Sequence, residues 1–454
     1  MAPQVSTAFK WTVYALVLGV PACFGESPNE MGHGQTRSSV GGAAATEGGG
    51  SSGGGSAPPV FAGASGGAST GGNSNGSSGS NGSSGSNGGS VSELGGHPPL
   101  GWNSWNTFQC NYDETLIRAV ADKFVSSGMK AAGYEYVNVD DCWMDGRDAA
   151  GKLKWNVAKF PSGIPALAGY VHSLGLKFGI YEAANTVTCV GIYNGVVPAV
   201  AVGSLGHEEE DAKSFASWGV DFLKYDLCRG DRKSFETMSA ALTASGRAIF
   251  YSINPEQPPD TQGWDSAISN MWRIAPDIAA NFQSVLSIFD ADLPFARFAS
   301  RGHWNDPDML EVGRGMSDAE DRAHFTLWAM LAAPLLAGND IRSMSASTEA
   351  VLTNHEVIAV DQDPLGAQAT IVYDDHAGRQ ILSKVLQGKD ARAVALLNRS
   401  DAPATMRVSW SMLKVAAGTA QARDLWVHRD LGLLSDSYAT TVPSHAVVLL
   451  RIFR

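Results

Sequence analysis

From Pro98 onward, short runs of strand-forming residues alternate with longer helical patterns, and this alternation restricts the fold more than any other feature of the sequence. It is typical of a parallel sheet, because neighbouring parallel strands need a long crossover connection that is usually a helix. The expected strands are residues 100–102, 136–139, 177–181, 222–224, 249–252, 271–274, 303–305 and 334–337. The expected helices are residues 114–127, 165–173, 208–218, 234–244, 282–298 and 318–332. Eight such strands predict an α/β fold, a (β/α)8 TIM barrel, with a doubly wound sheet as the main alternative.

After residues 362–366 (QDPLG) the helical pattern stops and short alternating segments follow. These segments are residues 380–385, 392–397, 406–409 and 446–452. Alternating strands separated by turn residues predict an antiparallel β-sandwich. We therefore expect a catalytic barrel at 96–366 and a C-terminal β-sandwich domain at 367–454, whose main role is packing.

The N-terminal region has a different character. Residues 11–22 form an apolar stretch that is too short to span a bilayer, which requires about 20 residues. With Lys10 before it and Cys23 after it, residues 1–23 are interpreted as a signal peptide, of ordinary type or of lipoprotein type with Cys23 lipidated. A buried N-terminal hydrophobic segment is the alternative. Residues 24–95 are rich in Gly, Ser and Asn and are expected to form a disordered linker. The protein is thus expected to be exported, either secreted or anchored by lipid at a bacterial cell envelope.

The charge pattern narrows the class of partner. The chain has a formal net charge of −12 and no run of basic residues, which argues against nucleic acid and is compatible with an uncharged saccharide. No cluster has zinc-site spacing and no glycine-rich loop has a phosphate-binding pattern, so we expect no metal and no cofactor. The four cysteines beyond Cys23 predict two disulfides, and their spacing leaves all three pairings open. The sequence does not define the oligomeric state.

Polar residues follow the expected strands, at the end where barrel enzymes carry their active sites. Glycoside hydrolysis needs two carboxyl groups at the anomeric carbon, about 5 Å apart when configuration is retained. Several carboxylates, a lysine, an arginine and an amide converging on one rim would suit a sugar with many hydroxyls. The candidates are Asp140, Asp141, Tyr181, Lys224, Asp226, Asn254, Arg273, Asp277 and Asp308.

Several longer motifs give a resemblance to a known family. They are PPLGWNSW (98–105), VDDCW (139–143), GSLGHEE (203–209), LKYD (223–226), WNDPDML (304–310), DLW (424–426) and VPSH (442–445). In this order they resemble family 27 of the glycoside hydrolases, which contains α-galactosidases and α-N-acetylgalactosaminidases. The resemblance extends from about Pro98 to the C-terminus.

The resemblance implies catalytic roles. Asp226, the aspartate of the LKYD motif, corresponds to the nucleophile of the family. Asp277, four residues after Arg273, corresponds to its acid/base. Lys224 precedes Asp226 by two residues, so both side chains should leave the strand on one face, where the lysine would favour the ionised carboxylate. A neighbouring ionised carboxylate is expected to raise the pKa of Asp277.

The resemblance also implies the substrate contacts. Asp140 and Asp141 would accept hydrogen bonds from the 4- and 6-hydroxyls, and Trp105 would present its ring to the sugar. Arg273 and Asp308 would contact hydroxyls near the reacting carbon, and Asn254 would contact the 2-hydroxyl. The implied substrate is therefore a terminal α-galactoside, rather than the substrate of a β-L-arabinopyranosidase or an α-N-acetylgalactosaminidase. A catalytically inactive carbohydrate-binding protein is the alternative of another class.

Two further features depend on the same resemblance. The family pairs its cysteines in a way that implies disulfides Cys110–Cys142 and Cys189–Cys228. An apolar stretch at 192–202 lies where many relatives are shorter. It is expected at the rim of the active site, where it would either shape specificity for the leaving group or pack without touching substrate.

Overall fold

The computed structural model describes residues 94–193, 200–228, 231–255 and 263–454. These residues belong to one compact unit of the chain, Ser83–Arg454. The expected signal peptide, Cys23 and nearly all of the expected linker lie outside the described residues. Within the described ranges, no helix is both long enough and apolar enough to cross a membrane.

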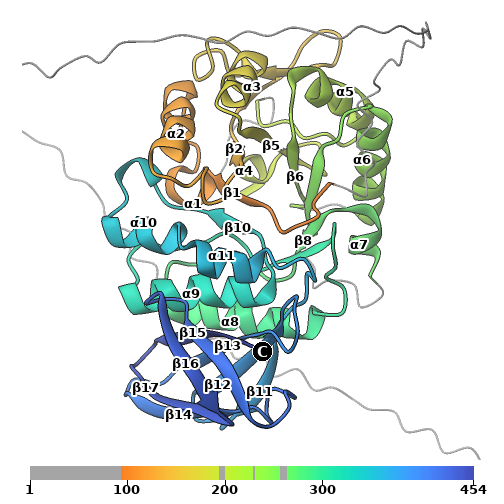
Figure 1. The fold of residues 1–454 in the computed structure, drawn as a ribbon. Coiled ribbons are helices and arrows are strands. Elements are labelled where there is room, and N and C mark those ends of the chain that lie inside the picture. The colour runs from red at the N-terminus through yellow and green to blue at the C-terminus, as the bar shows by residue number, and fades with distance from the viewer. Residues whose placement is uncertain (1–93, 194–199, 229–230, 256–262) are drawn as a thin grey trace, which may run out of the picture. The chain divides into compact units, whose positions relative to one another are not determined.

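Eight parallel strands form the central sheet, in the order β10-β1-β2-β5-β6-β7-β8-β9. Just beyond β9, Leu310 forms a parallel bridge with Ala337 of β10, and this bridge brings the two edges of the sheet together. The sheet therefore curls into the predicted (β/α)8 barrel rather than opening into a doubly wound sheet (Figure 1). The strands are β1 (Leu100–Asn103), β2 (Tyr136–Asn138), β5 (Lys177–Ala183), β6 (Phe222–Asp226), β7 (Phe250–Asn254), β8 (Met271–Arg273), β9 (Trp304–Asp306) and β10 (Leu335–Ala337).

Helices surround the sheet, and side-chain caps start several of them. Asp113 accepts a hydrogen bond from the backbone N–H of Leu116 at the start of α2, and Ser317 with Glu320 forms a capping box at the start of α9. The main helices are α2 (Glu114–Ser126), α3 (Ile164–Ser173), α5 (Glu208–Trp218), α6 (Arg232–Ala244), α8 (Phe282–Asp292), α9 (Asp318–Leu331), α10 (Ala346–Leu352) and α11 (His355–Asp361). Shorter elements are α1 (Trp105–Phe108), α4 (Cys189–Tyr193), α7 (Trp264–Ile268), the hairpin of β3 (Met144–Arg147) and β4 (Leu153–Trp155), and the 3-10 turns η1 (Leu293–Phe295) and η2 (Ile341–Ser343).

One predicted helix is too long. The sequence pattern predicts a helix over 282–298, but α8 ends at Asp292 and the short turn η1 follows. Pro294 lies in that turn, and proline lacks the backbone N–H that would continue the α-helical hydrogen bonds.

The C-terminal region is the predicted antiparallel β-sandwich. A six-stranded sheet, in the order β11-β12-β13-β18-β15-β16, accompanies a two-stranded sheet of β14 and β17. Buried side chains of both sheets, including Val394, Met406 and Leu450, form a core of their own. The strands are β11 (Thr370–Asp374), β12 (Arg379–Val385), β13 (Arg392–Asn398), β14 (Ala404–Ser409), β15 (Thr419–Asp424), β16 (Arg429–Ser435), β17 (Ser437–Val442) and β18 (Val447–Phe453).

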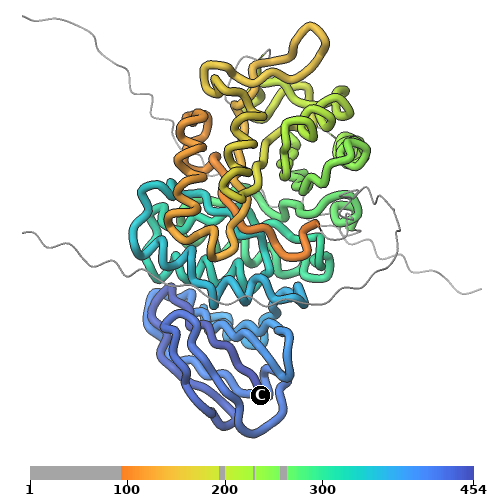
Figure 2. The backbone as a smooth tube through the Cα atoms, turned by 45° about the horizontal axis from the view of Figure 1, so that its top comes forward, coloured from red at the N-terminus to blue at the C-terminus, as the bar shows by residue number. Residues whose placement is uncertain are grey.

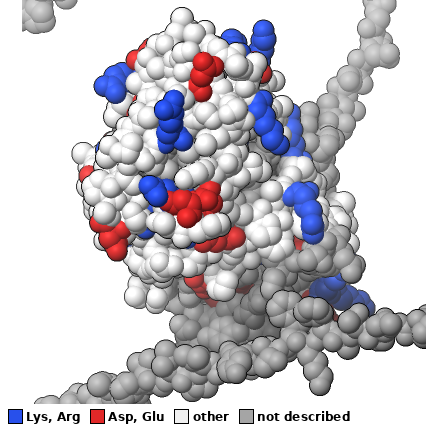
Figure 3. All heavy atoms as spheres, turned by 90° about the horizontal axis from the view of Figure 1, so that it is seen from below, with Lys and Arg blue, Asp and Glu red and all other residues white. Residues whose placement is uncertain are grey.

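The sandwich packs against α8 and α9 of the barrel (Figures 1 and 2). Lys384 of β12 donates a hydrogen bond to the carbonyl of Ala329 in α9 at 2.8 Å, and Trp426 donates to Thr326 at 2.9 Å. Because the sandwich covers α9, that helix is buried along most of its length. On the face of the protein shown in Figure 3, basic side chains lie scattered among acidic ones.

Candidate active site

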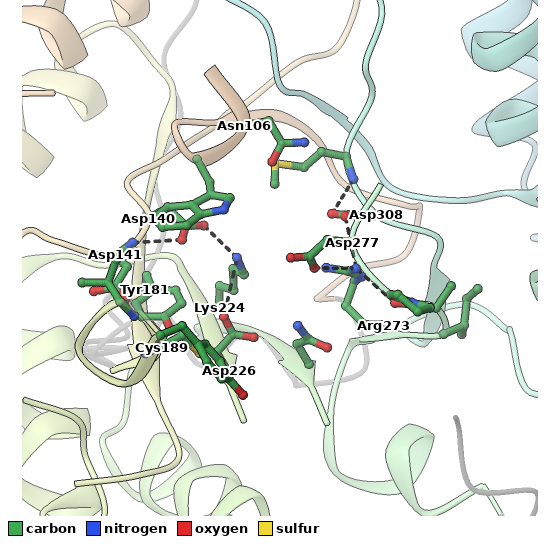
Figure 4. A pocket seen from close by; sticks show the side chains of 18 residues that line it. Asn106, Asp140, Asp141, Tyr181, Cys189, Lys224, Asp226, Arg273, Asp277 and Asp308 are labelled. Carbon is green, nitrogen blue, oxygen red and sulfur yellow. Dashed lines mark hydrogen bonds and ion pairs between the residues drawn. The ribbon is translucent and has the colours of Figure 1, made fainter. Parts of the chain in front are cut away.

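One cavity lies at the C-terminal ends of the barrel strands, and all of the predicted catalytic and substrate-binding residues line it (Figure 4). Its volume is about 530 Å³, within the usual range of small-molecule sites. The predicted residues in its lining are Trp105, Asp140, Asp141, Tyr181, Lys224, Asp226, Asn254, Arg273, Asp277 and Asp308. Side chains from strand ends that are far apart in the sequence thus line the same cavity.

The loop after β2 supplies two buried carboxylates. Oδ2 of Asp140 accepts hydrogen bonds from Nζ of Lys224 at 2.9 Å and from Nδ2 of Asn103 at 2.8 Å. Oδ2 of Asp141 accepts one from the backbone N–H of Val190 at 3.0 Å. Burial raises the pKa of Asp141 to about 6. These two groups are anchored acceptors that can receive further hydrogen bonds from a ligand.

Strand β6 places Lys224 and Asp226 on one face, as their spacing predicts. Nζ of Lys224 lies 3.8 Å from Oδ2 of Asp226, whereas it lies only 2.9 Å from Oδ2 of Asp140. Oδ1 of Asp226 is buried and accepts no hydrogen bond from the described residues. Burial raises the pKa of Asp226 to about 6, and Lys224 lowers it only in part. The lysine therefore acts in the expected direction, but desolvation outweighs it.

Arg273, the last residue of β8, organises the opposite wall. Its Nη2 lies 3.0 Å from Oδ1 of Asp277 and 3.1 Å from Oδ2 of Asp308. The Arg273 and Asp308 side chains are buried, whereas that of Asp277 is 78% exposed. Figure 4 shows Asp277 and Arg273 on one side of the cavity and Asp226 with Cys189 on the other.

The expected rise in the pKa of Asp277 is wrong for this structure. Desolvation acts to raise this pKa, but the charges of Arg273 and then Lys224 outweigh it, and the pKa lies below its ordinary value. The prediction considered only the neighbouring carboxylate, whereas the arginine in direct contact has the larger effect.

Asn254 and Trp105 complete the predicted lining. Asn254 is the last residue of β7 and pairs in register with Asp226, so its side chain enters between the two walls. Trp105 begins α1, and its backbone N–H donates to Oδ1 of Asn103 at 2.8 Å. Asn106 of the same short helix donates to the buried carboxylate of Glu311, which ties α1 to the loop after β9.

Several lining residues were not predicted from the sequence. They are Asn106, Val190, Ile274, Ala275, Pro276 and Met309; Cys189 was predicted only as a disulfide cysteine, and Tyr193 only as part of the 192–202 stretch. Most are apolar and lie in loops or short helices, whereas the prediction selected polar residues at strand ends. Two signals were available, because Asn106 follows Trp105 directly and Met309 belongs to the WNDPDML motif.

The apolar stretch at 192–202 is only partly described. Ile192 and Tyr193 end α4, residues 194–199 lie outside the described residues, and Val202 forms an antiparallel bridge with Val187. Tyr193 lines the cavity, which places the start of the stretch at the rim, as expected. Over the described ranges, no group of His, Cys, Asp and Glu side chains is arranged to hold a metal ion.

Comparison with known proteins identifies the family. The profile described as "Alpha galactosidase A" matches residues 97–363, and that of the "Alpha galactosidase C-terminal beta sandwich domain" matches 376–452. The chain belongs to the α-galactosidase A family. This membership confirms the resemblance to glycoside hydrolase family 27 that the motifs indicate.

Members of the α-galactosidase family match most of the chain. The α-galactosidase of Cyamopsis tetragonoloba is 47% identical over 365 residues, which cover 78% of this chain and 85% of the relative. The crystal structure of α-galactosidase I from Mortierella vinacea has a TM-score of 0.74 at 36% identity, covering 79% of this chain and 97% of that one. The Saccharomyces cerevisiae α-galactosidase solved with raffinose has a TM-score of 0.73 at 29% identity, covering 80% and 98%.

Both disulfides implied by the α-galactosidase family are present, and each joins two rim loops. Cys110–Cys142 links the loops that follow β1 and β2, and Cys189–Cys228 links those that follow β5 and β6. Cys142 and Cys228 each lie close in sequence to carboxylates of the cavity. The two crosslinks therefore hold one wall of the cavity in place.

Proposed function

We propose that this protein is a retaining exo-α-galactosidase that hydrolyses terminal α-D-galactosyl residues of oligosaccharides or polysaccharides. The observation that carries the proposal is a single cavity in which two carboxylates in contrasting environments face the same space, Asp226 buried and Asp277 exposed. Relatives that are 37–47% identical to this chain are named α-galactosidases. The family and the cavity thus support the same chemistry.

In the first step, a carboxylate oxygen of Asp226 attacks the anomeric carbon and forms a covalent galactosyl ester. The bond from that carbon to the leaving oxygen breaks, and the oxygen takes a proton from Asp277. In the second step, Asp277 removes a proton from water, and the water oxygen displaces Asp226 from the anomeric carbon. Two inversions at one carbon give net retention.

This cycle requires Asp226 to be ionised and Asp277 to be protonated at the start. The pKa of Asp226 is raised to about 6 and that of Asp277 is lowered, so the proton shared by the pair favours Asp226 before substrate binds. A bound galactoside would exclude water from the exposed Asp277, which raises the pKa of a carboxyl group. Substrate binding is therefore part of how the acid acquires its proton.

We further propose how the remaining lining residues bind galactose. Asp140 and Asp141 accept hydrogen bonds from the 4- and 6-hydroxyls, and Trp105 covers one face of the ring. Asn254 contacts the 2-hydroxyl, and Arg273 holds both Asp277 and Asp308 in position. Nζ of Lys224 lies over the ring of Tyr181, 5.3 Å from the ring centroid. The ring helps to hold this cation between Asp140 and Asp226.

The first experiment is an assay of the full chain with a chromogenic α-galactoside, run beside the matching α-N-acetylgalactosaminide and β-L-arabinopyranoside. We expect the galactoside to be cleaved with the highest kcat/KM, and proton NMR to show α-galactose as the first product. A higher kcat/KM for either of the other two substrates would overturn the galactose assignment. Binding without turnover of all three would support an inactive carbohydrate-binding protein instead.

We propose an arrangement of parts and a location as well. The catalytic domain spans 96–366 and the β-sandwich 367–454, since α11 ends at Asp361 and β11 begins at Thr370. The two disulfides are consistent with an exported protein. We place the protein at a bacterial cell envelope: residues 1–23 are the signal region, cleavage before Cys23 leaves Cys23 as the lipidated N-terminus of the mature protein, and residues 24–95 are a tether.

Fractionation of cells tests the location. Cys23→Ser should move the protein from the membrane fraction to a soluble one without changing its specific activity on an α-galactoside. A mature N-terminus at another residue, or one at Cys23 that is free of lipid, would favour simple secretion.

A further inference from the structure

Asp140, Asp141 and Cys142 form a tight turn directly after β2. The backbone N–H of Asp141 donates to Oδ1 of Asp140 at 2.9 Å, and that of Cys142 donates to Oδ1 of Asp141 at 2.7 Å. Cys142 has a φ of 83°, a conformation that residues other than glycine rarely adopt. Such a conformation persists only where the surrounding structure fixes it. The turn therefore needs support from neighbouring parts of the chain, and it carries both carboxylates proposed to bind the 4- and 6-hydroxyls.

Tyr112 holds this turn from outside the cavity. It lies in the loop between α1 and α2, its side chain is buried, and it is not part of the cavity lining. Its hydroxyl lies 2.6 Å from the backbone carbonyl oxygen of Asp140 and 2.6 Å from that of Asp141, so one proton is shared between two acceptors. Burial raises the pKa of this hydroxyl well above its usual value, and the charges of the two aspartates add to the rise. The hydroxyl therefore stays protonated at neutral pH and can donate.

Lys159 holds the same turn at its third residue. Its Nζ donates to the carbonyl oxygen of Cys142 at 3.1 Å and to that of Cys110 at 2.7 Å, the two residues that one disulfide joins. The ammonium group also lies over the ring of Tyr112, 5.0 Å from the ring centroid. Like Tyr112, Lys159 is not part of the cavity lining and borders a second hollow of the surface. All three carbonyl groups of the turn, those of the two aspartates and of Cys142, thus accept a hydrogen bond from Tyr112 or Lys159.

We propose that Tyr112 and Lys159 are positioning residues for galactose recognition, which hold the turn at 140–142 from behind so that the carboxylates of Asp140 and Asp141 face the 4- and 6-hydroxyls. This inference rests on the proposed function and adds to it two residues that do not touch the sugar. A hydrogen bond to a carboxylate weakens steeply when its geometry is lost. Both carboxylates lie on one side of the cavity, so a shift of this single turn moves both of them (Figure 4).

A purely structural role for Tyr112 makes a different prediction. If its hydroxyl served only to stabilise the fold, Tyr112→Phe would lower the melting temperature and reduce the cleavage of every galactoside in the same proportion. If it positions the turn, the loss should be concentrated on the hydroxyls that Asp140 and Asp141 bind. The 2-hydroxyl is proposed to contact Asn254, which lies on a different strand, β7. Substrates that each lack one hydroxyl therefore separate the two roles.

The experiment measures kcat/KM for an aryl α-galactoside and for its 2-deoxy, 4-deoxy and 6-deoxy analogues. The ratio of the galactoside value to each deoxy value reports how strongly the missing hydroxyl is bound in the transition state. Tyr112→Phe keeps the ring beside Lys159 and removes only the hydroxyl. We expect its 4-deoxy and 6-deoxy ratios to fall about three- to ten-fold, the effect of one hydrogen bond, and its 2-deoxy ratio to stay within about two-fold of that of the original chain. Lys159→Met, which keeps an unbranched side chain without the charge, should lower the same two ratios.

Tyr251→Phe is the matched control. Tyr251 is also buried, and its hydroxyl donates to a backbone carbonyl, that of Phe235 at 3.1 Å. It is not part of the cavity lining and makes no contact with the turn at 140–142 through that hydroxyl. All three ratios should therefore be unchanged in this variant.

Unchanged 4-deoxy and 6-deoxy ratios in a folded Tyr112→Phe protein, or an equal fall of all three ratios, would overturn the positioning role. If Tyr112→Phe does not fold, the same two outcomes for Lys159→Met decide the matter. An original chain that cleaves the 4-deoxy and 6-deoxy analogues as well as the galactoside would overturn the proposed contacts of Asp140 and Asp141. Absence of α-galactoside cleavage by the original chain would instead overturn the proposed function itself.

Discussion

The two walls of the cavity each pair an aspartate with a basic side chain, yet they shift the pKa of that aspartate in opposite directions. On the wall of β2 and β6, Lys224 lies 2.9 Å from Asp140 and 3.8 Å from Asp226, and burial raises the pKa of Asp226 to about 6. On the wall of β8, Arg273 lies 3.0 Å from Asp277, which is exposed and has a lowered pKa. The distance to the cation and the degree of burial therefore decide the pKa of each aspartate.

The largest expected effect is that of removing the buried carboxylate. Asp226→Ala should lower kcat about 10⁴-fold or more, because Asp226 forms the galactosyl ester in the proposed reaction, and Asp140 and Asp141 on the same wall are committed to the sugar hydroxyls. The circular dichroism spectrum and the melting temperature should change little. Lys224, the cation beside Asp226, still has its closer partner, Asp140 at 2.9 Å, so no buried charge is left unpaired. Activity close to that of the original chain, in a preparation free of contaminating enzyme, would refute the nucleophile assignment.

Removing the exposed carboxylate should have a smaller effect that depends on the substrate. Asp277→Ala is expected to lower kcat/KM on natural galactosides about 10²- to 10⁴-fold, the usual contribution of a general acid. An aryl galactoside with a good leaving group needs less protonation, so its kcat/KM should fall much less. Equal losses on the two substrates would show that Asp277 does not protonate the leaving group.

Asp430→Ala is a matched control for this variant. Asp430 lies on the sandwich, its side chain is also 78% exposed, and it pairs with Arg423 at 3.1 Å. Asp430 has the same exposure as Asp277 and also has an arginine partner, but it lies outside the cavity. The kcat/KM of Asp430→Ala should therefore be unchanged.

Between the two walls, Asn254 should have an intermediate effect. Asn254→Ser removes the proposed contact to the 2-hydroxyl and should cost about 1–3 kcal/mol, or about 5- to 150-fold in kcat/KM for galactosides. The preference for galactosides over α-N-acetylgalactosaminides should shrink, because the smaller side chain leaves room for the acetamide. Asn111→Ser, at an exposed position outside the cavity, is the control.

A second substrate checks the same contact without mutation. The original chain should cleave a 2-deoxygalactoside less efficiently than a galactoside, and Asn254→Ser should show little further loss on the 2-deoxygalactoside. If the original chain cleaves the 2-deoxygalactoside with the same kcat/KM as the galactoside, Asn254 does not bind the 2-hydroxyl.

The sequence predicts the barrel well and the sandwich only in part. All eight barrel strands were expected, because buried parallel strands are continuous apolar runs separated by clear helices. In the sandwich, β11, β15, β16 and β17 were not predicted. Strand β11 (TIVYD) and β16 (RDLGLLS) lie at the two edges of the sheet and are largely exposed, so their hydrophobic pattern is weak.

For the site, residue positions were predictable and electrostatics were not. The rule that barrel enzymes carry polar residues at strand ends selects Asp226 and Arg273 directly. It does not select Tyr193, which reaches the cavity from a short helix in an apolar stretch. Nor does sequence spacing reveal that Arg273 contacts Asp277 more closely than Lys224 contacts Asp226. The order of the two pKa values depends on those distances.

The smallest expected effect is a shift in the pH profile, and it tests whether the two walls influence each other. In kcat/KM, which reports the free enzyme, the active pair carries one proton, so activity rises with pH at the lowered pKa of Asp277 and falls with pH through the pKa of about 6 of Asp226. The charge of Asp277 raises the pKa of Asp226 and that of Arg273 lowers it. Asp277→Ala removes the first charge and leaves the second without its partner at 3.0 Å, and both changes lower the pKa of Asp226. Measured with an aryl galactoside, this variant should therefore lose the falling limb, and its activity should rise with pH through the pKa of Asp226, now below about 6. Asp430→Ala should keep both limbs where the original chain has them. A rising limb of the variant that lies at or above the pH at which the activity of the original chain falls would show that Asp277 carries no charge that changes the pKa of Asp226.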